Sequence, residues 1–131
     1  MTTRVLLIDD DVAVRTTMER LLTSLGYSVQ AADGAMSAVS MFVEGYFDVV
    51  VSDYRLLDSN GLELLQKIRD LAPATRTVIV SGLSVVQSDD EFAHADEWLQ
   101  KPVRLAALQT TIQDAIEKGH ARSDGLSPRP S

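Results

Sequence analysis

The sequence predicts an α/β fold in which helices cover both faces of a parallel, five-stranded sheet. Short, continuous apolar runs, typical of strands that are buried on both faces, alternate along the chain with segments whose apolar residues recur at helical spacing. The connections between these segments are short, and parallel neighbouring strands require helical crossovers of right-handed sense. A chain of 131 residues is long enough to form one such domain with a sizeable core.

The first strand and helix have clear boundaries. Val5–Ile8 is the first apolar run, and Asp11 is a suitable N-cap for the helix that follows it. Gly26 is suited to end that helix, because glycine readily adopts the left-handed conformation found just past helix ends. The apolar stripe of this helix comprises Val14, Met18, Leu21, Leu22 and Leu25.

The second unit begins with a short strand at Tyr27–Ala31, and we expect its helix to end at Gly45. The third strand is Phe47–Ser52, followed by the loop Asp53–Asn60 and a helix that Pro73 stops. The stripes of these two helices comprise Ala35, Ala38, Val39, Phe42 and Val43 in the first, and Leu64, Leu65, Ile68, Leu71 and Ala72 in the second.

The remaining elements differ in clarity. The fourth strand, Thr77–Ser81, is rich in β-branched residues. In Ser84–His94 an acidic run interrupts the apolar residues, so we expect a short or irregular fourth helix. The fifth strand is Glu97–Gln100. The final helix carries a stripe of Leu105, Leu108, Ile112, Ala115 and Ile116. Periodicity ends at Gly119, so we expect a folded domain of residues 1–118 and a disordered tail at 119–131.

Composition excludes several classes of function. A net charge of −7 argues against nucleic acid as a direct partner, because such binding needs a basic face. The absence of cysteine excludes disulfides, thiolate metal sites and a catalytic thiol. The start of the chain does not resemble a signal peptide, and no apolar run approaches the ~20 residues of a membrane span. We therefore expect a cytoplasmic protein that does not insert into membranes.

Polar side chains gather at the predicted carboxyl ends of four strands. These residues are Asp9, Asp10, Asp53, Ser81 and Lys101. In open parallel sheets, ligands bind at this edge. Clustered carboxylates repel one another, and a hard divalent cation such as Mg²⁺ relieves that repulsion. With a lysine and a hydroxyl to hold a phosphoryl group, the set indicates phosphoryl transfer to a carboxylate nucleophile, for which Asp53 is the best candidate.

Five segments of the chain resemble the response-regulator receiver domain of two-component signalling. They are Val5–Asp11, Val50–Leu56, Gly61, Val78–Gly82 and Trp98–Pro102, and they lie in the family's order across residues 4–118. The resemblance implies a flavodoxin-like, doubly wound (βα)₅ fold with the parallel strand order 2-1-3-4-5. A single aspartate after a strand is most often a turn former or helix cap, so the prediction depends on the whole set.

The resemblance also implies roles for individual residues. Asp53 would be the phosphoacceptor. Asp9, Asp10, Asp53 and the main-chain carbonyl of Arg55 would bind Mg²⁺, or another divalent cation such as Mn²⁺.

The remaining roles concern the phosphoryl group and the response to it. Lys101 would contact the phosphoryl group, Ser81 would be the switch hydroxyl, and Trp98 would be the aromatic residue that changes rotamer with it. The Lys101–Pro102 peptide bond is expected to be cis. Leu57 departs from the family, which usually has proline there, so we expect a less rigid loop beside the site.

The leading hypothesis is a stand-alone receiver that accepts a phosphoryl group from a sensor histidine kinase or a histidine phosphotransfer protein and signals to an unknown protein target. Such a domain catalyses only its own phosphorylation and dephosphorylation. If the chain is a piece of a longer protein, its tail would be a linker remnant. One alternative is an interaction module that ignores phosphorylation. Another is a phosphatase with an aspartyl nucleophile, which the sequence disfavours because Arg55 stands where a general acid is required.

Overall fold

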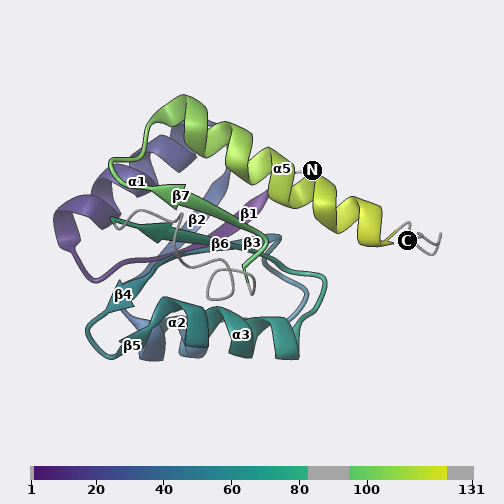
Figure 1. The fold of residues 1–131 in the computed structure, drawn as a ribbon, viewed down its shortest axis with the longest axis horizontal. Coiled ribbons are helices and arrows are strands. Elements are labelled where there is room, and N and C mark those ends of the chain that lie inside the picture. The colour runs from purple at the N-terminus through teal and green to yellow at the C-terminus, as the bar shows by residue number, and fades with distance from the viewer. Residues whose placement is uncertain (1, 83–94, 124–131) are drawn as a thin grey trace.

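The computed structural model describes residues 2–82 and 95–123, so the predicted fourth helix at 84–94 lies outside the described residues. Five parallel strands form one sheet in the order β2-β1-β3-β6-β7 (Figure 1). This is the predicted flavodoxin-like order, since β6 and β7 are the fourth and fifth strands of the sheet. The strands are β1 (Arg4–Ile8), β2 (Ser28–Ala32), β3 (Val49–Asp53), β6 (Arg76–Ser81) and β7 (Glu97–Gln100).

The described helices cover the sheet from both sides. Helices α1 (Val12–Ser24) and α5 (Leu105–Ser123) lie over one face, and α2 (Ala35–Met41) and α3 (Gly61–Leu71) lie over the other (Figure 1). Because successive strand residues point to opposite faces, each central strand contributes to two apolar layers. In β1, Leu6 and Ile8 pack in the layer that includes α2 and α3, whereas Val5 and Leu7 pack in the layer that includes α1 and α5.

Local signals set the ends of α1 as the sequence predicted. The carboxylate of Asp11 accepts a hydrogen bond from the Val14 N–H at 3.1 Å, which satisfies a donor that has no partner within the helix. At the other end Gly26 has φ 93° and donates its N–H to the Thr23 carbonyl at 2.9 Å. Both predictions for this helix are confirmed.

Helix α2 ends at Met41, so the prediction that it continues to Gly45 is wrong. Phe42 leaves the helix in an extended conformation, with φ −70° and ψ 128°. Its ring stacks on Phe47 with the ring centroids 6.0 Å apart, and it packs against the core. Burial of this ring outweighs the further helical turn that the apolar spacing suggested, and Gly45, with φ 83°, serves a separate turn.

Several strand boundaries differ from the sequence prediction by one or two residues, and two other differences are larger or lie beside the site. Asp53 is the last residue of β3, and the predicted loop after it contains a small antiparallel ladder of β4 (Arg55–Leu56) and β5 (Ser59–Asn60). Helix α5 runs to Ser123, beyond the predicted boundary at residue 118, because a glycine at 119 costs a helix only about 1 kcal/mol. None of the helices in the described part of the chain has the length and hydropathy needed to span a membrane.

Candidate functional site

Three carboxylates meet at the carboxyl edge of the sheet. Strands β1 and β3 are neighbours, with Ile8 opposite Ser52, so the residues that follow lie side by side. Asp9, Asp10 and Asp53 each place one carboxylate oxygen within 4.8 Å of the others. Asp9 is buried, and the other two are partly buried. A set of hard oxygen ligands this close together fits Mg²⁺, which prefers carboxylates and water.

Lys101 brings a positive charge to the same cluster. Its Nζ lies 3.2 Å from Asp53 Oδ1 and 3.7 Å from Asp9 Oδ2. The lysine follows β7 directly, and its N–H donates to the Ser81 carbonyl at 2.8 Å, which continues the ladder between β6 and β7. The Lys101–Pro102 peptide bond is cis, as predicted.

The electrostatic environment raises the pKa of Asp53 above the usual carboxyl range. Burial is the largest cause, because it disfavours the charged form. Lys101 opposes it through its charge and a hydrogen bond, whereas the charges of Asp9 and Asp10 raise the pKa further. A divalent cation at this cluster would favour the ionised form of Asp53.

Asp9 is held in place from several directions. Its N–H donates to the Ala32 carbonyl at 3.2 Å, and its carboxylate accepts from the Asp11 N–H at 2.9 Å. Its main-chain carbonyl accepts from Arg15 Nη1 at 2.8 Å. Arg15 is not among the residues predicted for the site, although its position four residues after Asp11 puts it within reach of the end of β1.

Asp10 accepts a short hydrogen bond from the turn between β4 and β5. Its Oδ2 accepts the main-chain N–H of Leu57 at 2.6 Å, a short bond to a charged acceptor. The contact joins residues that are 47 positions apart, and main-chain donors leave no trace in the residue types. No pattern in the sequence could have indicated it.

Gly61 is the point at which α3 approaches the phosphoacceptor candidate most closely. A Cβ atom at this position would lie 2.1 Å from the Asp53 carbonyl oxygen and 3.0 Å from its carbonyl carbon. The Gly61 N–H also donates to the Tyr54 carbonyl at 2.8 Å. Any side chain here would push α3 away from the end of β3, which gives a physical reason for the glycine.

The remaining predicted residues occupy three different environments. Ser81 is 1% exposed at the end of β6. Trp98 is 46% exposed on β7, so its ring is at the surface in this conformation, and a rotamer change remains a prediction. Arg55 is exposed and pairs with Asn60 in the ladder of β4 and β5, and its role as a main-chain ligand also remains a prediction.

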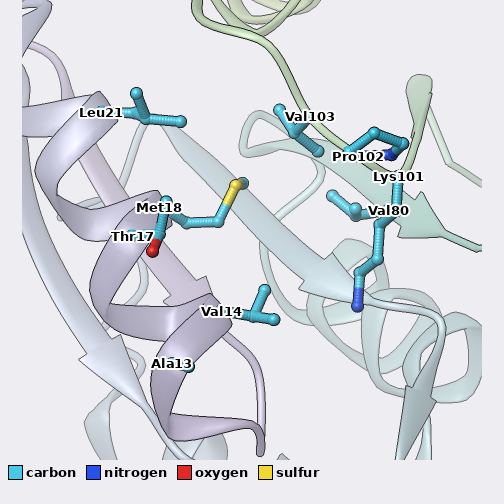
Figure 2. Close-up of a pocket in the computed structure, with 9 residues that line it drawn as sticks. All are labelled: Ala13, Val14, Thr17, Met18, Leu21, Val80, Lys101, Pro102 and Val103. Carbon is cyan, nitrogen blue, oxygen red and sulfur yellow. The ribbon is translucent and has the colours of Figure 1, made fainter.

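An apolar groove of about 490 Å³ opens beside Lys101, between α1 and the segment after β7. Figure 2 shows α1 side chains on one side of the groove and residues of β6 and the segment after β7 on the other. The residues that line it include Val14, Met18, Leu21, Val80, Pro102 and Val103. The groove therefore adjoins the ammonium group that contacts Asp53.

The fold and the site define a flavodoxin-like α/β protein with an acidic cluster and a lysine at the carboxyl edge of its sheet. The chain matches the family model described as "Response regulator receiver domain" over residues 5–113. It therefore belongs to the response-regulator receiver family, in which bound magnesium and phosphorylated aspartate are typical.

Curated relatives and solved structures agree with this membership. The chain is 33% identical over 123 residues to the transcriptional regulatory protein ZraR of Salmonella typhimurium, covering 92% of the chain and 27% of that protein. It is 39% identical over 116 residues to the alginate biosynthesis transcriptional regulatory protein AlgB of Pseudomonas syringae pv. tomato, covering 87% and 26%. The chain thus spans about a quarter of the length of these two relatives.

A similar solved structure is the CheY-like response regulator receiver domain protein from Methanospirillum hungatei JF-1. It has a TM-score of 0.83 and 27% sequence identity, and the match covers 93% of this chain and 99% of that one. Nearly the whole of that solved receiver domain therefore corresponds to this chain.

Proposed function

We propose that this receiver accepts a phosphoryl group from a phosphohistidine donor onto Asp53 and signals through contact with another protein. The observation that carries the proposal is the position of the Asp53 carboxylate, 3.2 Å from the Lys101 ammonium and inside a cluster of three carboxylates that fits Mg²⁺. We also propose that the domain acts in the cytoplasm. Regulation by phosphorylation, with no activity toward other substrates, is part of the same proposal.

The chemistry follows from these positions. An oxygen of the Asp53 carboxylate attacks the phosphorus, an O–P bond forms, and the P–N bond to the donor imidazole breaks. The imidazole nitrogen keeps the electron pair of the broken bond, and the ring, protonated at its other nitrogen, leaves as neutral imidazole. Lys101 binds a phosphoryl oxygen during the transfer. The carboxylates of Asp9, Asp10 and Asp53 would hold Mg²⁺, which would supply further charge neutralisation for the phosphoryl group. Hydrolysis by water later restores the carboxylate and releases inorganic phosphate.

The ionisation of Asp53 matters for this step, because only the carboxylate form is a nucleophile. Burial raises its pKa, and Lys101 opposes that effect. Lys101 therefore has two functions in the proposal: it favours the ionised form of Asp53 before the reaction and binds the phosphoryl group during it.

The groove beside Lys101 is the surface on which we place the phosphohistidine donor. Apart from Thr17, the α1 side chains that line it are apolar, and it opens next to the charged site (Figure 2). A helix of a sensor histidine kinase or a histidine phosphotransfer protein that packs on α1 would bring a histidine on its surface toward Asp53. A donor docked in the groove would thus lie beside the site of transfer.

The response to phosphorylation would begin at Ser81, which is buried at the end of β6. Its hydroxyl would donate to a phosphoryl oxygen, and the movement would reach Trp98, whose neighbour across the ladder is Ile79. A surface that changes in this way would bind one protein target in one state only.

Phosphorylation by acetyl phosphate with Mg²⁺ tests the proposal directly. Intact-protein mass spectrometry should show one added phosphoryl group on the wild type and none on Asp53→Asn. Asp114→Asn, an exposed carboxylate on α5, is the matched control and should react like the wild type. An unmodified wild type, or a modified Asp53→Asn, would contradict the proposal. Catalytic hydrolysis of p-nitrophenyl phosphate would favour the phosphatase alternative, and partner binding that ignores the phosphorylation state would favour the interaction module.

A further inference from the structure

We propose that Asp58 is a positioning residue for the metal site: it ties the turn between β4 and β5 to the start of α2 and so holds the Leu57 N–H against Asp10. The inference rests on the proposed function, because Asp10 matters here as a ligand of Mg²⁺. Three parts of the structure support this role, namely the contact with α2, the contact with Asp10 and the weak turn that connects them.

The first part is the contact between Asp58 and α2. One carboxylate oxygen accepts the Ala35 N–H at 2.9 Å, and the other accepts the Met36 N–H at 3.0 Å. Helix α2 begins after Gly34, which has no side chain to cap it, so Asp58 supplies the cap from a distant part of the chain.

The space for this cap depends on Gly34. A Cβ at Gly34 would lie 3.1 Å from the Asp58 oxygens, so a larger residue there would crowd the carboxylate. The two main-chain hydrogen bonds lower the pKa of Asp58, which therefore stays ionised at neutral pH. Charge-assisted bonds of this kind are stronger than neutral ones.

The second part is the contact with the metal site. Leu57 directly precedes Asp58, and its N–H donates to Asp10 Oδ2 at 2.6 Å. This bond restricts rotation of the Asp10 carboxylate and so fixes the oxygen that remains for a cation. Loss of a group that orients a metal ligand in this way typically weakens metal binding by about 10–100-fold.

The third part is the weakness of the turn. The Leu57 side chain is 93% exposed, so it contributes no packing, and the ladder of β4 and β5 has only two residues in each strand. Leu57 also stands where proline is usual in receiver domains, and a proline would stiffen the turn but could not donate an N–H. In this chain, the buried Leu56 and the two bonds of Asp58 hold the turn in place.

The first test observes the Leu57 amide by NMR in metal-free protein. In the wild type its proton should resonate far downfield and exchange slowly, because the bond to Asp10 is short and charge-assisted. Asp58→Ala should move the resonance toward the random-coil value and speed up exchange. Asp33→Ala is the matched control: it removes the same charge at the same end of α2, where Asp33 bonds Ser37 rather than the turn. It should leave the Leu57 amide unchanged.

The second test measures Mg²⁺ affinity by calorimetry. Asp58→Ala should weaken binding about tenfold or more, the range seen when a residue that orients a ligand is lost. Asp58→Asn keeps one acceptor oxygen and should give an intermediate loss, whereas Asp33→Ala should bind like the wild type. Circular dichroism checks that each variant is folded.

The outcomes separate the inference from the proposed function. Wild-type affinity in Asp58→Ala, an unchanged Leu57 amide in that variant, or an equal loss in Asp33→Ala would overturn the inference and leave the proposed function intact. Failure of the wild-type protein to bind Mg²⁺ would overturn the proposed function and the inference with it.

Discussion

Replacing Gly61 with alanine would place a methyl group against the main chain of Asp53. The new Cβ would lie 2.1 Å from the Asp53 carbonyl oxygen and 3.1 Å from Ile79 Cδ1. A flexible side chain could rotate away from such a contact, but the carbonyl belongs to β3 in the centre of the sheet. The strain must therefore be relieved by moving α3 or the end of β3.

The structure sets the size of the expected effect. The clash requires a main-chain displacement of about 1 Å, and overpacking of this kind costs about 1–3 kcal/mol of the free energy of unfolding. We expect a loss near 3 kcal/mol, the upper end of that range, because both contacting groups are held by secondary structure. A shift of about 1 Å in a reacting group slows reactions by roughly 100-fold, so the phosphorylation rate should fall by about that factor.

Two measurements on the same variant test these numbers. Urea denaturation followed by circular dichroism gives the change in the free energy of unfolding. Intact-protein mass spectrometry during reaction with acetyl phosphate gives the phosphorylation rate.

Gly45→Ala is the matched control for this variant. Gly45 has φ 83° and no atom within 4 Å of an added Cβ, so alanine there costs about 1–2 kcal/mol through backbone strain alone. Its phosphorylation rate should stay at the wild-type value. The reasoning would be refuted if Gly61→Ala reacted at the wild-type rate, or if Gly45→Ala slowed to the same degree.

The charges of Asp53, Lys101 and Asp96 each have a measurable effect on stability or on phosphorylation. Burial raises the pKa of Asp53, so there is a pH window in which the metal-free folded protein keeps the proton of this carboxyl group and the unfolded chain has lost it. The free energy of unfolding should therefore fall as the pH rises through that window. In urea titrations, Asp53→Asn should not show this fall with pH and should be more stable than the wild type at neutral pH. An unchanged pH dependence of the free energy of unfolding would contradict the raised pKa of Asp53. Lys101→Met should raise the pKa of Asp53 further and slow phosphorylation about 100-fold. A pH–rate profile with acetyl phosphate measures both effects, and a profile like that of the wild type would count against the role of Lys101. Asp96→Ala should lower the free energy of unfolding by about 3–5 kcal/mol, because it removes the carboxylate of a buried ion pair with Arg76. Urea denaturation measures this loss, and a value below about 1 kcal/mol would mean that the pair contributes no more than a surface ion pair does.

The buried pair of Arg76 and Asp96 illustrates what the sequence could not reveal. Arg76 is 3% exposed at the start of β6, and its Nη1 lies 3.4 Å from Asp96 Oδ1. Asp96 also accepts from the N–H and the hydroxyl of Thr77, at 2.8 Å and 3.0 Å. A charged residue at the edge of an apolar run usually marks the surface, so local pattern alone favoured the opposite placement.

The sequence by itself determined the succession of the five sheet strands and the described helices, and the edge at which the polar residues gather, whereas the strand order was implied by the resemblance to receiver domains. Apolar periodicity is set by which faces of an element are buried, and caps such as Asp11 act on residues three positions away. These signals are local, so they can be recognised without coordinates. The position of Asp9, Asp10 and Asp53 at strand ends was sufficient to place them together, because parallel strands end at one edge.

Only the tertiary structure decided the features that depend on close approach between distant segments. The stacking of Phe42 on Phe47 ended α2 early, and the glycine at position 61 was explained only by its distance from the Asp53 carbonyl. The hydrogen bonds from the Leu57 N–H to Asp10 and from α2 to Asp58 join main-chain donors to side chains across the fold. Main-chain groups are the same at every residue except proline, so the choice of donor that reaches a carboxylate is set by register and distance and leaves no pattern in the sequence.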